Sequence, residues 1–207
     1  MEIDYNWPVE SKKGKNEGSM AQPFYKSPVF YVCGLLLFLY LGLENCVNAW
    51  FVTYFMGMNI MSSAYATNLV PVTWVMVMLG RLLTAKLSSK VDKNKLILAN
   101  CVATTIFFFL LTATHSLPVI TVAIAGLGFF FAGIYPTTVS SVGSIIKGST
   151  AGMSLFLAIA ALGGIVTPQI VGFLADRIGM TAAILVLAFN AVGMLVMAAV
   201  NVGMKKR

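Results

Sequence analysis

The chain has 207 residues, of which 58% are hydrophobic and only 10% are charged, and its mean hydropathy is +0.87. Soluble globular proteins are about one quarter charged, so this composition excludes a compact aqueous fold, a disordered chain and a secreted disulfide scaffold. The net charge of +7 does not indicate a nucleic-acid surface, because the basic residues lie between hydrophobic runs, where they set membrane topology. We therefore expect an integral membrane protein that contacts the lipid bilayer and binds no nucleic acid.

The first 27 residues are polar and carry four lysines and four acidic residues, whose charges cancel. They contain neither the apolar run nor the small-residue cleavage site of a signal peptide. The sequence predicts three regions. Residues 1–27 form a polar cytoplasmic tail or linker, residues 28–203 a transmembrane domain, and residues 204–207 a basic cytoplasmic C-terminus.

Six apolar stretches follow the tail, and each is near or above the ~20 residues that cross a bilayer core. They cover residues 28–55, 62–85, 95–114, 117–142, 150–174 and 180–203. None of them alternates with a period of two, so their backbone groups are satisfied within helices rather than between the strands of a barrel. The sequence predicts an all-α integral membrane fold of six transmembrane helices.

The distribution of Lys and Arg indicates the topology of these helices. Thirteen of the fourteen basic residues fall in the tail, at the C-terminus or in connections on one side of the membrane, and only Arg177 falls on the other side. In this count Arg81 belongs to the connection after the second stretch. The positive-inside rule then predicts a multi-pass protein of the cell membrane with both termini in the cytoplasm.

A short internal similarity suggests that the six helices form two three-helix repeats. Residues 80–83 end the second stretch, and the similar residues 172–175 lie 92 positions later, at the end of the fifth stretch. Because three is an odd number, two such units enter the membrane from opposite sides, as in the inverted repeats of many secondary transporters. With this offset, Pro136 corresponds to Glu44.

Glu44 is the one charged residue that falls well inside a predicted membrane segment. A carboxylate at that depth costs about 2.5 to 3.5 kcal/mol on insertion scales, so we expect it to face a cavity or a partner. At 100° per residue, Tyr40, Glu44 and Asn48 share one face of the helix, and Asn45 lies at its flank. A carboxyl group beside two amides suits sugar hydroxyls or proton coupling. The alternative is an interhelical hydrogen-bond clamp.

Glycine and proline mark the fourth and fifth predicted helices. The fourth contains Gly133 and Pro136, and the fifth contains Gly163, Gly164 and Pro168. Proline removes a backbone donor and glycine lets a second backbone approach, so we expect kinked or locally opened helices that act as hinges beside a cavity. Close helix packing is the alternative explanation for each of these residues.

Further polar or aromatic residues of the helices complete the candidate set for substrate binding or proton coupling, namely Asn68, Trp74, Tyr135, Gln169 and Asn190. The three cysteines form no CxxC pair and have no His neighbour, so neither a metal site nor a disulfide framework is expected. The motifs of soluble enzymes, such as the P-loop, GxSxG and HExxH, do not occur in the sequence. We therefore expect no enzymatic activity and no cofactor.

Several of these residues resemble a known family. Residues 40–44 (YLGLE), with Trp50 and Tyr54, are similar to the YxGxE…W…Y pattern in the seventh helix of fucose-permease-like members of the major facilitator superfamily. Residues 80–81 (GR) resemble that superfamily's connection between helices eight and nine. Residues 133–136 (GIYP) resemble its tenth helix, and residues 168–177 the end of its eleventh. Thr84 stands where the superfamily's loop signature has an Asp.

The resemblance runs from about residue 28 to the C-terminus, and such transporters have twelve helices in two six-helix halves. It implies that this chain is the second half of a secondary active transporter, which moves a small polar solute by alternating access with ion coupling. The solute is expected to be a sugar or a related metabolite, and the partner a second six-helix half or a second copy. The alternative is a helical membrane protein without transport, either an assembly partner or the remnant of a truncated gene.

Overall fold

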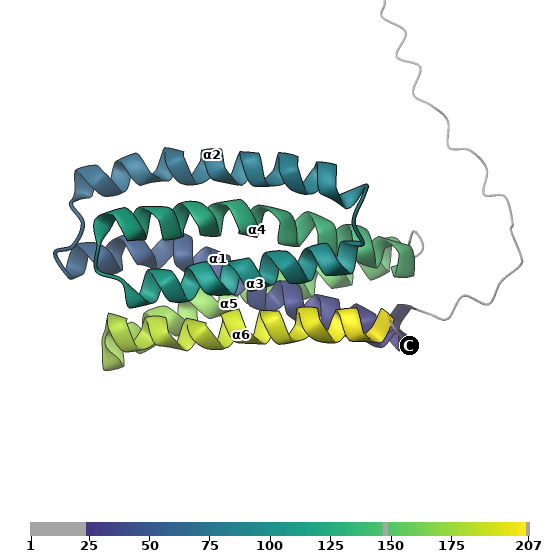
Figure 1. Ribbon diagram of the computed structural model, residues 1–207. Coiled ribbons are helices and arrows are strands. Elements are labelled where there is room, and N and C mark those ends of the chain that lie inside the picture. The colour runs from purple at the N-terminus through teal and green to yellow at the C-terminus, as the bar shows by residue number, and fades with distance from the viewer. Residues whose placement is uncertain (1–23, 147–148, 206–207) are drawn as a thin grey trace, which may run out of the picture.

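The computed structural model describes residues 24–146 and 149–205, and over these residues it is a bundle of long helices (Figure 1). A short 3-10 helix, η1 (Phe24–Lys26), is followed by α1 (Pro28–Gly57), α2 (Ser63–Ser88), α3 (Lys93–Ala113), α4 (Leu117–Ile146), α5 (Thr150–Ile178) and α6 (Met180–Lys205). All six α-helices are long and apolar enough to cross a membrane. The predicted all-α fold of six transmembrane helices is therefore confirmed.

Two predicted regions fall largely outside the described residues. The structure does not describe residues 1–23 of the tail or residues 206–207 of the basic C-terminus. Lys147, which was counted for the topology, also lies outside the described residues. The division of the chain into tail, membrane domain and C-terminus thus stays a prediction at both ends.

The helix ends follow from local sequence chemistry. Ser62, Asp92 and Ser149 each cap the helix that follows them, because the side-chain oxygen accepts a hydrogen bond from a backbone N–H of the first turn. Pro28 opens α1, where its missing N–H leaves no helical hydrogen bond unmade. Gly179 ends α5 with a φ of 85°, a conformation that a residue with a side chain rarely adopts. These signals produce short connections and antiparallel neighbours.

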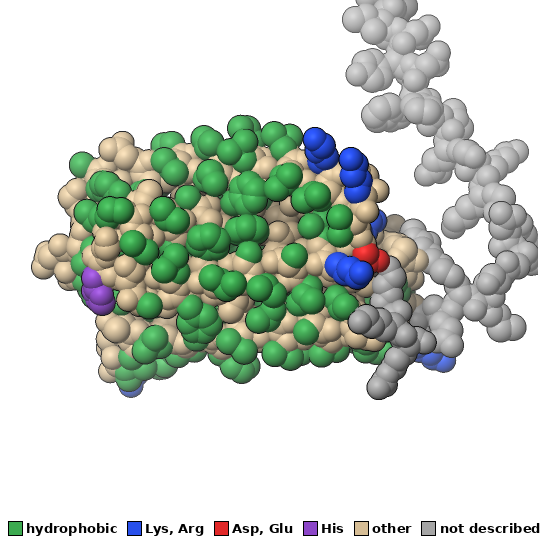
Figure 2. All heavy atoms as spheres, in the orientation of Figure 1, with side chains coloured by type: hydrophobic (Ala, Val, Ile, Leu, Met, Phe, Trp, Pro, Cys, Tyr) green, Lys and Arg blue, Asp and Glu red, His purple; other side chains and the backbone are tan. Residues whose placement is uncertain are grey.

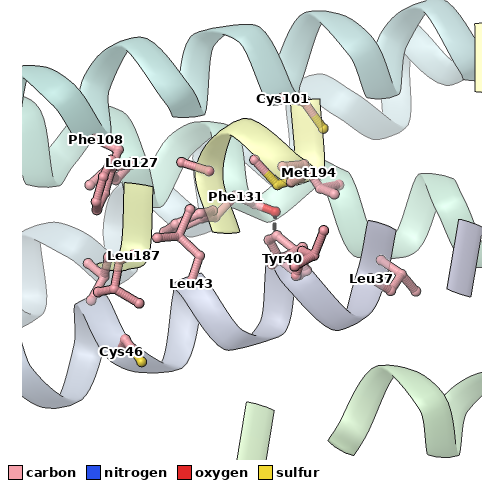
Figure 3. Close-up of a cluster of buried hydrophobic side chains, with 14 of the residues drawn as sticks. Leu37, Tyr40, Leu43, Cys46, Cys101, Phe108, Leu127, Phe131, Leu187 and Met194 are labelled. Atoms are coloured by element: carbon pink, nitrogen blue, oxygen red, sulfur yellow. Dashed lines mark hydrogen bonds between the residues drawn. The ribbon is translucent and has the colours of Figure 1, made fainter. Parts of the chain in front are cut away.

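The core of the bundle lies between α1, α3, α4 and α6. Figure 3 shows side chains from these helices meeting in one cluster, including Leu43, Cys101, Phe108 and Leu187. The flanking helices α2 and α5 are far less covered. Only 17% of the apolar window of α2 and 22% of that of α5 are buried, compared with 56% for α1 and 50% for α4. Helices α2 and α5 thus present wide apolar faces to their surroundings.

Two close helix crossings repeat across the bundle. Gly80 of α2 lies against the carbonyl of Phe129 on α4, and Gly163 of α5 lies against the carbonyl of Phe38 on α1. A Cβ atom at either glycine would overlap the facing carbonyl group. Small residues at such crossings let two backbones approach in a membrane, where packing rather than hydrophobicity joins helices.

A polar junction accompanies each crossing, one helical turn further along. In the first, Thr84 of α2 and Asn100 of α3 meet at Gly133 of α4, where both side chains lie in the space that a Cβ atom would fill. The junction is buried, with Thr84 and Asn100 each 7% exposed. This packing explains why a threonine, and not a larger side chain, stands at position 84.

The second junction has the same composition on the other three helices. Thr167 of α5 and Asn190 of α6 meet at Gly42 of α1 in the same way. The Asn190 amide also donates hydrogen bonds to the carbonyl oxygen of Leu39 (3.3 Å) and to Oγ1 of Thr167 (3.5 Å). The two three-helix units therefore repeat one glycine, threonine and asparagine arrangement.

These contacts correct the predicted register of the repeat. The crossings match Gly80 with Gly163, 83 positions apart, and not with Gly172. Helices α1 and α4 correspond with an offset of 91 positions, which pairs Pro136 with Asn45 and not with Glu44. The offset is 91 positions between α1 and α4 but 83 positions between α2 and α5. It differs because fewer residues separate α4 from α5 than separate α1 from α2. Equivalent helices run in opposite directions, so the repeat is inverted as predicted.

Charged side chains separate the two ends of the bundle. Lys and Arg gather at the end where α1 begins, α6 finishes and the α2–α3 connection lies, and His115 lies at the other end (Figure 2). We name these the basic end and the opposite end. The described lysines at the basic end are Lys26, Lys86, Lys90, Lys93 and Lys95.

A methyl group at either crossing should loosen the bundle. We expect Gly80→Ala and Gly163→Ala each to destabilise the protein by about 1 to 3 kcal/mol, because the Cβ atom forces two backbones apart. Thermal unfolding in mild detergent measures this. Gly143→Ala is the matched control, since a Cβ atom at this helical glycine meets no heavy atom within 4 Å. Equal stability of the three variants and the parent protein would contradict the crossing.

Candidate functional site

Two cavities follow one another along α1, α2 and α4. The basic-end cavity has a volume of about 750 Å³ and is lined by residues of α1, α2 and α4 together with Lys93, namely Tyr40, Leu41, Glu44, Arg81, Thr84, Ala85, Ser88, Ala132, Tyr135, Pro136, Thr137 and Ser140. The opposite-end cavity has a volume of about 330 Å³ and is lined by residues 44–52, 66–81 and 124–131 of the same helices. Both volumes fall within the ~300–1,000 Å³ typical of sites for small molecules.

Glu44 lines both cavities, and its side chain is half-buried. Tyr40 lies one helical turn before it and is only 2% exposed. The Tyr40 hydroxyl donates a hydrogen bond of 3.1 Å to the carbonyl oxygen of Phe131, and the two rings pack edge to face (Figure 3). Phe131 lies 91 positions after Tyr40, so equivalent residues of the two repeats meet here at the centre of the bundle.

Arg81 is a site residue that sequence reasoning missed. It lines both cavities together with Glu44. The prediction counted Arg81 with the connection, although the second stretch was drawn to residue 85, and in the structure Arg81 lies inside α2, about two turns before its end at Ser88. The signal that could have found it is the apolar sequence on both sides, since a charge inside a membrane helix is costly and rare.

Helices α4 and α5 run through their prolines without a break, so the predicted local opening does not occur. Each proline nevertheless leaves the carbonyl group four residues earlier without its helical donor. In α5, Pro168 frees the carbonyl of Gly164, and Nδ2 of Asn45 donates a hydrogen bond of 3.0 Å to it. In α4, Pro136 frees the carbonyl of Ala132, and both residues line the basic-end cavity.

The structure divides the remaining predicted site residues into three groups. Tyr135 lines the basic-end cavity, and Asn48 and Trp74 line the opposite-end cavity. Asn45 and Asn190 lie outside both linings, in the contacts of α1 with α5 and α6 described above. Asn68 and Gln169 are exposed and line neither cavity.

The glycines expected to act as hinges lie at tight helix contacts. Gly133 and Gly163 are buried against neighbouring helices, and a Cβ atom at Gly164 would overlap the amide of Asn45. Close packing, the alternative given for these residues, accounts for all three positions. Among the residues that the structure describes, no cluster of His, Cys, Asp and Glu could hold a metal ion.

No family model matches the chain, but curated proteins are similar to it. The chain is 28% identical over 173 residues to a glucose/galactose transporter of Brucella abortus biovar 1 (strain 9-941), and to the protein of the same name in Brucella abortus (strain 2308). Each match covers 83% of this chain but 41% of the relative. The chain thus spans less than half the length of the curated relatives that it matches.

Two solved structures show the same arrangement of helices. FucP, a major facilitator superfamily transporter in the outward conformation, superposes with a TM-score of 0.73 at 20% identity, over 84% of this chain and 42% of FucP. A variant of the Escherichia coli fucose:proton symporter FucP superposes with a TM-score of 0.72 at 22% identity, over 86% and 44%. The matched proteins are transporters and not enzymes. The chain therefore has the fold of one six-helix half of a major facilitator superfamily transporter.

Proposed function

We propose that this chain is one half of a secondary active transporter that moves a small polar solute, a sugar or a related metabolite, across the cell membrane. One observation carries the proposal. The carboxyl group of Glu44 lies where two consecutive cavities meet inside a six-helix bundle of this fold. The similarity to a glucose/galactose transporter and to a fucose:proton symporter supports a sugar as the solute.

The chemistry of the cavity walls suits a solute with many hydroxyl groups. Tyr135, Thr137 and Ser140 line the basic-end cavity, and their hydroxyls can both donate and accept hydrogen bonds. Ala132, whose carbonyl group Pro136 leaves without a helical donor, lines the same wall. In the opposite-end cavity, Trp74 offers an apolar ring face of the kind that packs against the C–H face of a sugar.

Glu44 is the residue that we assign to ion coupling. Of the described residues that line the two cavities, it is the only acidic one, and it sits between hydroxyl-rich and apolar walls. A carboxyl group in this position can take up a proton from one cavity and release it into the other as the transporter alternates between its two open states. Tyr40, one turn away, and Asn48, one turn beyond, complete the polar stripe on α1.

The open face of the bundle implies a partner. Arg81 is exposed and Glu44 is half-exposed, and each charge costs about 2.5 to 3.5 kcal/mol when it faces lipid. Helix α2, which lines both cavities, is also the least covered of the six described helices. A second six-helix half, or failing that a second copy of this chain, covers this face and closes the solute pathway.

Neutralising the carboxyl group tests the coupling role. We expect Glu44→Gln to keep the shape and the fold but to reduce solute uptake driven by an imposed pH gradient at least tenfold, while solute exchange without a gradient persists. Vesicles that contain the assembled transporter are the system to measure. Asp176→Asn, at an exposed acid of α5 outside both cavities, is the matched control. Gradient-driven uptake that survives in Glu44→Gln would leave Glu44 as a helix clamp.

The partner can be sought directly. We expect the chain, extracted from its native membrane in mild detergent, to run as a complex of twelve helices, because the charged face of α1 and α2 is then shielded from lipid. Native mass spectrometry identifies the second component. A strictly monomeric particle that still transports solute after reconstitution would rule this out.

The orientation follows from the basic residues and can be tested with single cysteines. We expect Lys90→Cys, at the basic end, to react with an impermeant thiol reagent from the cytoplasmic side, and His115→Cys, at the opposite end, to react from outside. The three native cysteines are buried, and the parent chain provides the blank. Labelling of both positions from one side would contradict this topology.

A further inference from the structure

A third cavity lies at the basic end of the bundle. Its wall is formed by the ends of the four core helices α1, α3, α4 and α6 together with the connection between α2 and α3, so we name it the axial cavity. Helices α1 and α3 begin at this end, and α4 and α6 finish there (Figure 1). The cavity has a volume of about 520 Å³, which suits a small molecule. The positive-inside rule assigns this end to the cytoplasm.

The axial cavity is distinct from the two cavities of the candidate site. Of its described lining residues, Ser88, Lys93 and Ser140 also line the basic-end cavity, and none lines the opposite-end cavity. Nζ of Lys93 donates a hydrogen bond of 2.7 Å to Oγ of Ser140, so this contact belongs to the walls of both cavities. The rest of the wall draws on α3 and α6, which apart from Lys93 take no part in the candidate site.

Asn201 of α6 lines the axial cavity with an amide that has no partner. It is only 1% exposed, and within the described part of the chain neither its Nδ2 nor its Oδ1 atom makes a hydrogen bond. Buried amides are nearly always hydrogen-bonded, because an unmade bond leaves the full desolvation of the group uncompensated. A molecule bound in the cavity can supply both the acceptor and the donor that Asn201 lacks.

A second asparagine of the same wall is already held in place. Asn94 of α3 is 9% exposed, and its Oδ1 accepts a hydrogen bond of 3.0 Å from Oγ of Ser141 on α4. Its backbone N–H is also satisfied, because Oδ1 of Asp92 accepts from it at 3.0 Å in the cap of α3. One amide of the wall is therefore fixed by the protein, and the other is left for a ligand.

The polar groups of the wall indicate the class of ligand. Six of its described residues have side chains that both donate and accept hydrogen bonds, namely Ser88, Ser140, Ser141, Ser144, Asn94 and Asn201. The charged residues of the described lining are Asp92 and Lys93, and their formal charges cancel. A wall of mixed donors and acceptors without net charge suits an uncharged molecule with several hydroxyl groups. An anion such as phosphate instead favours a surplus of positive charge and of donors.

We propose that the axial cavity is a second binding site, on the cytoplasmic face, for an uncharged polyhydroxylated molecule such as a monosaccharide or a polyol. Asn201 anchors the ligand, because its Nδ2 donates to one hydroxyl oxygen and its Oδ1 accepts from a neighbouring hydroxyl. The serines of α4 bind further hydroxyl groups. This site goes beyond the proposed function, since binding here does not require the chain to transport anything.

Protection of a single cysteine tests the site without requiring transport. Ser144→Cys places a thiol at an exposed position of the axial cavity that lines neither of the other two. The rate of its reaction with a soluble methanethiosulfonate is measured on the assembled protein in mild detergent. The probes are glucose, galactose, fucose and glycerol, each in excess, and inorganic phosphate. Lys90→Cys, exposed at the same end but outside all three cavities, is the control for general effects.

We expect at least one uncharged probe to slow the labelling of Ser144→Cys at least fivefold, while phosphate does not slow it and Lys90→Cys keeps its rate. Asn201→Leu should abolish this protection without lowering thermal stability, because in the described structure the amide has no hydrogen bond to lose. Asn68→Leu, at an exposed asparagine of α2 outside all three cavities, is the matched control and should keep the protection. Asn201→Ala replaces Asn201→Leu should the branched side chain prevent assembly.

Three results overturn the proposal. Unchanged labelling of Ser144→Cys with every uncharged probe would leave Asn201 to water alone. Protection that survives in Asn201→Leu and Asn201→Ala would place the ligand elsewhere, as would binding confined to the basic-end cavity. Protection by phosphate alone would make the cavity an anion site. Protection and uptake can fail separately, because protection without uptake would remove the transport function alone, and uptake without protection would remove the axial site alone.

Discussion

The close approach of α2 to α4 and of α5 to α1 is the constraint on which the other features of the bundle depend. Lipid tails are as apolar as the helices, so burial of apolar surface does not drive helix association within the membrane, and packing must do so. Gly80 and Gly163 provide that packing by admitting a carbonyl group of the facing helix where a side chain would otherwise stand. The crossings hold α2 against α4 and α5 against α1, and in this packing Glu44 and Arg81 line the same two cavities.

Proline and asparagine determine how backbone carbonyl groups inside the membrane are satisfied, because lipid offers them no hydrogen-bond donor. The carbonyl freed by Pro168 is satisfied by the amide of Asn45, so the helix crosses the membrane without a break. The carbonyl freed by Pro136 belongs to Ala132 and lies at a cavity wall. The hydrogen bond that proline removes is therefore replaced by a contact between helices in α5, whereas in α4 the freed carbonyl belongs to a residue that lines a cavity.

The sequence predicted the features that depend on one helix at a time. It did not predict the features that depend on how two helices pack against each other. Helix number, helix bounds within a few residues and the cavity position of Glu44 follow from hydropathy and from the 100° rotation per residue. The register of the repeat could not be predicted from the sequence. Gly163 and Gly80 are equivalent because each faces a backbone carbonyl of a neighbouring helix, and the residues beside them in the sequence do not show this. Arg81 was missed because it was counted with the basic residues of the following connection, although it lies four residues before the predicted end of the second stretch and inside α2.

The two inverted repeats share one arrangement of helices but carry different side chains at equivalent positions. These differences lie where the candidate site is. The offsets of 83 and 91 positions pair Arg81 with Gly164 and Glu44 with Tyr135, so neither charge has a charged counterpart. The junction of Asn190 is closed by two hydrogen bonds, whereas in the described structure Nδ2 of Asn100 has no partner and Thr84 beside it lines the basic-end cavity. A symmetric scaffold can hold an asymmetric site only if the contacts that stabilise it stay separate from the groups that react. The Gly crossings meet the first need, because none of their four residues lines either cavity, and α1, α2 and α4 carry the reactive groups at other positions.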